Sequence, residues 1–164
     1  MSNVKLRKIS SLEGTEAWNT DSAGRILMPA RPAFDASPTS TIAHNTNPIP
    51  MPYVHVNNGN CFNSNGSFTA PITGTYYFFM HFLGGTATTV FRFYAMFNGS
   101  TFDETHCRLA SEAGNDYNHT SLTFIKPMNK DQTMAVKMVA DDGASSAYAD
   151  GNPGYQRFGG FLLY

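Results

Sequence analysis

The stretch that decides the fold is MPYVHVNNGNCFNSNGSFTAPITGTYYFFMHF, residues 51–82. From Gly74 onward almost every residue is apolar or aromatic. Alternate side chains of a β-strand point to opposite faces, so the odd-numbered residues Tyr77, Phe79 and His81 share one face and the even-numbered residues share the other. An antiparallel sheet normally leaves one face in water, and a strand that is apolar on both faces needs a second burying surface. We expect the even-numbered face to fill the core and the odd-numbered face to form a subunit interface.

Composition supports an all-β fold in one main domain. The chain has 164 residues, 41% of them hydrophobic, 13% aromatic and only 14% charged, compared with about 25% charged in typical soluble proteins. Phe, Tyr, Asn, Thr, Ser and Gly are abundant, and these residues favour strands and turns over helices. The net charge is −1, without a large basic cluster, which argues against nucleic-acid binding.

Membrane insertion and secretion are not expected. The longest apolar stretch is far shorter than the roughly 20 residues that span a bilayer. The N-terminal residues carry basic side chains but no following apolar block, so they do not resemble a secretory signal. Cys61 and Cys107 lack the spacing of a metal or redox motif, and we expect both to be reduced thiols in a chain made in a cytoplasm.

The chain divides near residue 30. Residues 1–30 are polar and form a leader, and Pro29 and Pro32 mark a boundary because proline resists helices and central strands. The leader is either a flexible tail or a segment for attachment or trimer threading. Residues 31–164 contain short apolar or alternating runs between Gly, Asn and Pro clusters, the pattern of a sandwich or jelly roll. The expected strands are Ala33–Ala36, Tyr53–Val56, Ser67–Ala70, Gly74–Leu83, Thr89–Phe97, Thr101–Ala110, His119–Lys126, Gln132–Ala140 and Tyr155–Tyr164.

Residues 51–82 resemble the signature of the C1q-like family, which is related in fold to tumour necrosis factor. The residues on or near that signature are Asn57, Phe62, Phe68, Gly74, Tyr76 and Phe78. Further similar pieces follow in family order: PAFDA at 32–36, NKDQ at 129–132 and AYADGNPGYQRFGGFLLY at 147–164. The resemblance implies a jelly-roll sandwich of about ten antiparallel strands that assembles as a homotrimer, with Tyr77, Phe79 and His81 in the interface.

A second resemblance concerns the leader. The phrase TDSAGRILMPARPAF, residues 20–34, is similar to the lead-in of C1q-like or fibre-tip domains in bacteriophage structural proteins. This similarity implies a virion protein that is assembled in the host cytoplasm. The N-terminal segment would then attach the head to other virion proteins.

Enzyme activity is not expected. The sequence lacks HExxH, GxSxG, a Gly-rich phosphate loop and the His/Cys spacing of a zinc site. His106 stands beside Cys107, but neighbouring residues of a strand point to opposite faces and cannot act as a nucleophile pair.

We expect no cofactor and no metal centre, with calcium as the one open question. Some C1q-like proteins bind calcium through acidic loop residues near the trimer apex. The candidates in predicted turn regions are Asp103, Glu104, Asp141, Asp142 and Asp150. The alternative is that they are ordinary solvated acids, since no loop of EF-hand type is present.

Recognition is the expected function, and the best candidate site is the loop at residues 141–154. Tyr148, Asp150, Asn152 and Tyr155 combine aromatic platforms with amide and carboxylate groups, which suits a host surface glycan. The alternatives are a purely structural knob, such as a capsid decoration or tail connector, and a cellular C1q-like lectin. The sequence identifies neither the receptor, nor the host, nor the position on the virion.

Overall fold

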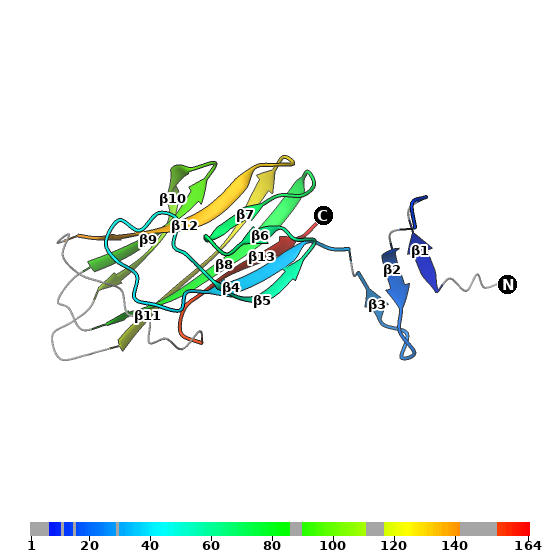
Figure 1. Ribbon diagram of the computed structural model, residues 1–164, viewed down its shortest axis with the longest axis horizontal. Helices are drawn as coiled ribbons and strands as arrows, with labels where there is room; N and C mark the ends of the chain where they lie inside the picture. Colours follow the sequence, from blue (N-terminus) through cyan, green and yellow to red (C-terminus); the bar gives the residue numbers. More distant parts are fainter. Residues whose placement is uncertain are drawn as a thin grey trace.

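The described part of the chain is entirely β-structured. The computed structural model describes residues 7–10, 12–14, 16–28, 30–85, 90–110, 117–141 and 154–164. Within these residues, thirteen strands form three antiparallel sheets, and no helix is present that could cross a membrane (Figure 1).

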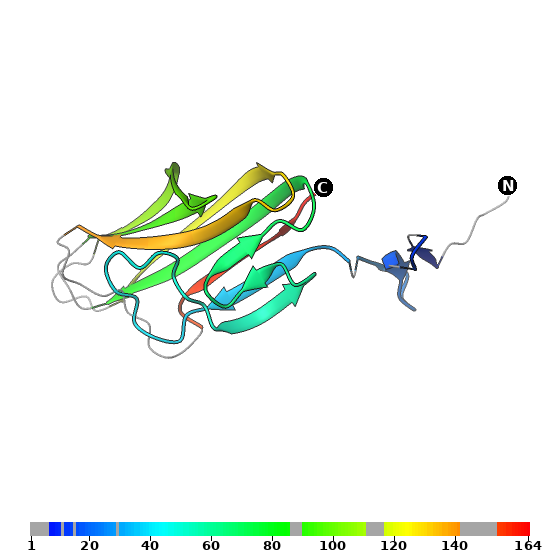
Figure 2. The same cartoon turned by 45° about the horizontal axis from the view of Figure 1, so that its top comes forward.

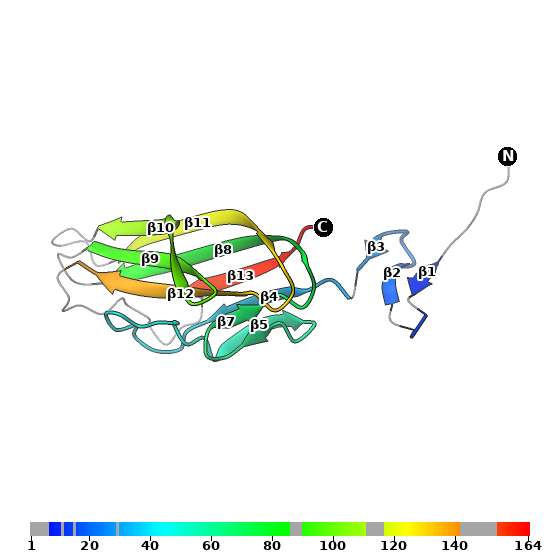
Figure 3. The same ribbon diagram turned by 90° about the horizontal axis from the view of Figure 1, so that it is seen from above.

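A small sheet of three strands lies at the N-terminal end. It contains β1 (Lys8–Ser10), β2 (Glu16–Thr20) and β3 (Ile26–Leu27), in the order β1-β2-β3. The backbone N–H groups of Ala23 and Arg25 both donate to Oδ1 of Asp21 at 2.9 Å, and Gly24 takes the left-handed φ of 79° that this turn requires. Figure 3 shows the small sheet standing apart from the rest of the molecule.

The remaining ten strands form two sheets of five strands each. The first, called here the β8 sheet, has the order β11-β8-β13-β4-β5. Its members are β4 (Ala33–Ser37), β5 (Tyr53–Asn58), β8 (Gly74–Gly85), β11 (Tyr117–Met128) and β13 (Arg157–Leu162). The second, called here the β9 sheet, has the order β10-β9-β12-β7-β6. Its members are β6 (Phe62–Asn63), β7 (Ser67–Thr69), β9 (Val90–Phe97), β10 (Ser100–Ala110) and β12 (Thr133–Ala140).

This arrangement confirms the predicted jelly-roll sandwich of about ten antiparallel strands. Each of the nine expected strands is present, and each expected end lies within two residues of the observed one. The sequence analysis missed β6 and the three leader strands. It also ended β8 too early, at Leu83 rather than Gly85. The strand continues through Gly84 and Gly85 because both pair with β11, opposite Asn118 and Tyr117.

Aromatic side chains join the two sheets, whose arrangement as two layers is seen in Figure 2. The even-numbered residues of β8 are buried, which confirms that this face fills the core. Phe82 of β8 stacks on Phe93 of β9 with ring centroids 4.0 Å apart, and Phe34 of β4 stacks on Phe68 of β7 at 5.0 Å. Full burial of one such side chain contributes about 1.5–3 kcal/mol.

Both cysteines are free thiols, as expected, and both are buried. The Sγ atom of Cys61 donates to the carbonyl oxygen of Asn58 at 3.3 Å. Cys107 lies in β10 with its side chain in the core, while its neighbour His106 is exposed. The two side chains therefore point to opposite faces, and they form no nucleophile pair.

Candidate functional site

The outer face of the β8 sheet contains the three residues predicted for a subunit interface. Tyr77, Phe79 and His81 are half-buried in the single chain. Their neighbours across β13 are Phe161, Gly159 and Arg157, and their neighbours across β11 are Ile125, Thr123 and Ser121. The face is thus built by three adjacent strands, with β8 in the middle.

Phe79 lies directly over Gly159 at the centre of this face. A Cβ atom at Gly159 would overlap Cζ of Phe79 and would stand 2.9 Å from the backbone oxygen of Phe34. Glycine therefore lets the phenyl ring rest against the backbone of β13. The ring of Phe79 therefore lies against the sheet and does not stand out from it. This arrangement suits close approach by another chain.

The apolar end of the face lies toward the leader. The rings of Tyr77 and Phe161 have centroids 5.2 Å apart, and Cζ of Arg31 stands 5.0 Å from the centroid of Phe161. The guanidinium of Arg31 also donates from Nε to the carbonyl oxygen of Leu162. Ile125, which faces Tyr77 across the strand pair, is 59% exposed.

The other end of the face is polar. Nδ1 of His119 and Nε2 of His81 are 3.1 Å apart, and the two imidazole rings stack at 5.0 Å. Arg157 forms a two-point ion pair with Asp35, in which Nε donates to Oδ1 at 2.9 Å and the terminal nitrogen donates to Oδ2. Burial, with a smaller contribution from nearby His119, lowers the pKa of His81. Hydrogen bonding to Asp35 raises the pKa of Arg157.

The outer face of the β9 sheet has a different chemistry. Its outward residues include Arg92, Tyr94 and Lys137, and on the edge strand β10 His106 and Arg108 are exposed. Long charged side chains of this kind remain hydrated at little cost. The two outer faces therefore differ: the β9 sheet has a surface suited to water, whereas the centre of the β8 sheet has aromatic rings.

The predicted recognition loop is described only in part. Tyr148, Asp150 and Asn152 lie outside the described residues. Tyr155 is described, is 38% exposed and precedes the start of β13. A grouping of these four side chains therefore stays a prediction.

Of the acidic residues considered for calcium, only Asp141 has a described side chain, so a grouping of the five stays a prediction. Asp103 and Glu104 were placed in a turn, which is wrong, because β10 runs through both positions with an irregular register between Thr101 and His106. The carboxylate of Asp141 accepts a hydrogen bond from Arg92 at 2.8 Å. Asp142 and Asp150 lie outside the described residues. Among the residues that are described, no three His, Cys, Asp or Glu side chains form a metal cluster.

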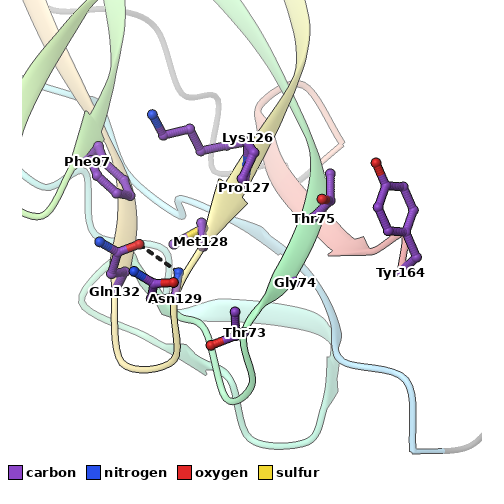
Figure 4. A pocket seen from close by; sticks show the side chains of 10 residues that line it. All are labelled: Thr73, Gly74, Thr75, Phe97, Lys126, Pro127, Met128, Asn129, Gln132 and Tyr164. Carbon is purple, nitrogen blue, oxygen red and sulfur yellow. Dashed lines mark hydrogen bonds between the residues drawn. The ribbon is translucent and has the colours of Figure 1, made fainter.

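A polar depression of about 530 Å³ was not anticipated from the sequence (Figure 4). It is lined by Thr73, Gly74, Thr75, Phe97, Lys126, Pro127, Met128, Asn129, Gln132 and Tyr164. The ammonium group of Lys126 stands 4.5 Å from the ring centroid of Phe97, and the backbone N–H of Asn129 donates to Oε1 of Gln132 at 2.7 Å. Its lining comes from β8, β9, β11, the turn between β11 and β12, and the C-terminus, so no single stretch of sequence could reveal it.

Comparisons with known proteins agree with this architecture. A family model described as the C1q domain matches residues 33–163. The globular domain of zebrafish complement 1qA is similar with a TM-score of 0.64 and 18% sequence identity, over 82% of this chain and 98% of that chain. Murine APRIL at pH 5.0 is similar with a TM-score of 0.64 and 14% identity, over 81% and 99% of the two chains. The search of curated proteins gave no match.

Proposed function

We propose, because the chain belongs to the C1q domain family, that it is the head of a homotrimeric recognition protein carried on a virus particle. C1q domains are generally binding modules without enzyme activity, and the matched region covers nearly the whole head. The finer parts of the proposal are the trimer, the virion location and the host ligand. Each has its own support and its own test.

One observation carries the trimer: the aromatic outer face of the β8 sheet in a single chain. Tyr77, Phe79 and Phe161 present apolar rings there, and Ile125 is exposed beside them. Water would surround these groups in a monomer, at a cost of about 25 cal/mol for each Å² of apolar surface left uncovered. Two further copies of the chain, related by a threefold axis, would remove that surface from water.

The test replaces one aromatic on each outer face. Tyr77→Asp puts a carboxylate into the proposed interface in all three copies, and burial of an unpaired charge costs several kcal/mol. Tyr94→Asp makes the same chemical change on the β9 sheet, where Arg92 lies nearby to pair with it. Multi-angle light scattering at micromolar concentration should give a trimer for the wild type and for Tyr94→Asp, and a smaller species for Tyr77→Asp. A wild-type monomer would contradict the trimer.

The virion location is supported by the leader. Its sequence from 20 to 34 is similar to lead-in segments of phage structural proteins, as noted above. Its small sheet leaves several apolar side chains exposed, among them Ile9, Ile26 and Leu27. Three short strands without a covered hydrophobic face are marginal alone, so a partner surface is expected to stabilise them. Mass spectrometry and immunogold labelling of purified particles test whether the protein is present and where.

The host ligand is proposed to be a surface component, with glycan as the favoured class. Weak binding by one head would be raised by avidity, since three heads share one axis. The isolated trimer should adsorb to susceptible bacteria and compete with particle attachment. Tyr155→Ala together with Tyr148→Ala should reduce adsorption and leave the trimer intact.

The matched control for that experiment is Tyr53→Ala, an exposed tyrosine in β5 that is not part of the proposed recognition loop. If wild-type heads neither adsorb nor compete, while the protein is found on particles, the head is a structural knob of the virion. If particles lack the protein altogether, the cellular lectin takes the place of the virion proposal.

A further inference from the structure

The histidine pair on the outer face of the β8 sheet has the geometry of a metal site. His81 faces Ser121 across the strand pair and His119 faces Leu83, so the two histidines are diagonal neighbours on one face. Diagonal neighbours on a sheet are within reach of each other only when both side chains are long or aromatic. Here Nδ1 of His119 and Nε2 of His81 approach to 3.1 Å. We propose that these two imidazoles hold one transition-metal ion of the Zn²⁺ class.

The separation of the two nitrogens fits this ion. Zinc binds imidazole nitrogen at about 2.0–2.1 Å. With the two nitrogens 3.1 Å apart, the N–metal–N angle at an ion equidistant from both is about 100°. A tetrahedral site requires about 109°, so a shift of a few tenths of an ångström is sufficient. Imidazole is also a good ligand for Cu²⁺ and Ni²⁺, so Zn²⁺ serves here as the probe for transition-metal ions that bind histidine.

The charges around the pair permit a cation. Arg157 of β13 lies opposite His81, and it is the charged group of the neighbouring strand. Its guanidinium is turned toward β4, where both Asp35 oxygens accept its hydrogen bonds. The positive charge therefore points away from His119, which lies on the opposite side of β8.

Two protein ligands leave the remaining coordination positions open. Within the described part of the chain no third His, Cys, Asp or Glu joins the pair, so water or a neighbouring copy must complete the site. The binding by the pair itself does not require the trimer. Completion by a neighbouring copy rests on the proposed function, since it requires the β8 sheet to be the subunit interface.

The test uses the full chain after treatment with a chelator. Calorimetric titration with ZnCl₂ at pH 7.5 should show saturable binding of one ion per chain. His81→Gln and His119→Gln should each abolish it, because either change removes one of the two ligands. His106→Gln is the matched control, since His106 is a surface histidine of the β9 sheet beside Tyr94, and it should bind like the wild type. X-ray absorption should show two imidazole nitrogens at about 2.0–2.1 Å.

Other outcomes separate this proposal from the trimer. A monomer that binds one Zn²⁺ through both histidines contradicts the trimer and supports the site. A trimer without saturable binding contradicts the site, and the 3.1 Å contact is then a hydrogen bond between two imidazoles. Binding that survives both glutamine variants, or that is also lost in His106→Gln, overturns the proposal as well. Circular dichroism with chelator present should show that all variants are folded.

Discussion

Gly159→Ala should destabilise the protein, because the added methyl group would clash with Phe79 and with the backbone of Phe34. Gly159 does not have the left-handed φ that would itself demand glycine, so alanine is compatible with its backbone. The new methyl group would nonetheless overlap Cζ of Phe79 and lie 2.9 Å from the backbone oxygen of Phe34. The phenyl ring can turn away, but the carbonyl belongs to β4, which pairs with β13 at this position.

The expected magnitude follows from these two contacts. Overpacking of this kind costs about 1–3 kcal/mol, while the restricted unfolded chain returns about 0.4–1 kcal/mol. We therefore expect a net loss of about 1–2 kcal/mol in the free energy of unfolding. In a Phe79→Ala background the ring is absent but the Phe34 carbonyl remains, so the loss caused by Gly159→Ala should be smaller by about 0.5–1 kcal/mol, at the low end of the usual coupling between residues in contact.

Urea unfolding of the wild type, the two single variants and the double variant measures this coupling. All four must be compared at one protein concentration, because the stability of an oligomer depends on concentration. The reasoning is refuted if Gly159→Ala is neutral or stabilising. It is also refuted if the penalty is the same with and without Phe79, because the ring would then not rest on Gly159.

Three further predictions concern ionisable groups. Cys61 and Cys107 are free, so dithiothreitol should leave the melting temperature unchanged, whereas loss of a disulfide would remove about 2–4 kcal/mol. Burial raises the pKa of Cys107 to about 11, so iodoacetamide at pH 8 should label it only when the chain unfolds, as mass spectrometry can show. Burial and His119 lower the pKa of His81, and Arg157 of β13 also lies beside it. The unfolded chain therefore binds a proton at this histidine more readily than the folded chain. The free energy of unfolding should then fall as the pH drops below about 6.5. The melting temperature should therefore drop less between pH 7.5 and pH 5 in His81→Gln than in the wild type, and an equal drop would contradict this assignment.

The sequence predicted the fold well because its strands carry strong local signals. The alternation from Tyr76 to Phe82 separates a core face from an outer face without any knowledge of the partner strands. The elements that it missed lack such signals. β6 has only two residues in an Asn-rich segment, and the leader strands have two to five residues of mixed polarity. Runs of two to five residues are too short to show a clear period, so only pairing with a neighbour reveals them.

The candidate site was predicted only along one strand. Tyr77, Phe79 and His81 follow from the period of two, but Phe161, Arg157 and His119 join them through the register of β13 and β11. Register between strands far apart in sequence is fixed by packing, which one sequence does not display. One signal was available: Ser121, Thr123 and Ile125 alternate with the apolar residues Leu122 and Phe124. Their placement against β8 was not deducible.

The topology places the leader and the C-terminus at one end of the sandwich. The leader joins at the end of the sandwich where the backbone N–H of Leu162 donates to the carbonyl oxygen of Pro32 at 3.0 Å, and the C-terminus lies at the same end (Figure 1). β8 runs from that end to Gly85, and β12 finishes at Ala140 beside Phe91 near the opposite end. Tyr155, just before β13, lies toward this far end as well, since Arg157 pairs with His81. In a head that is held by its leader, Ala140 and Tyr155, the described residues that flank the proposed recognition loop, would therefore lie away from the point of attachment.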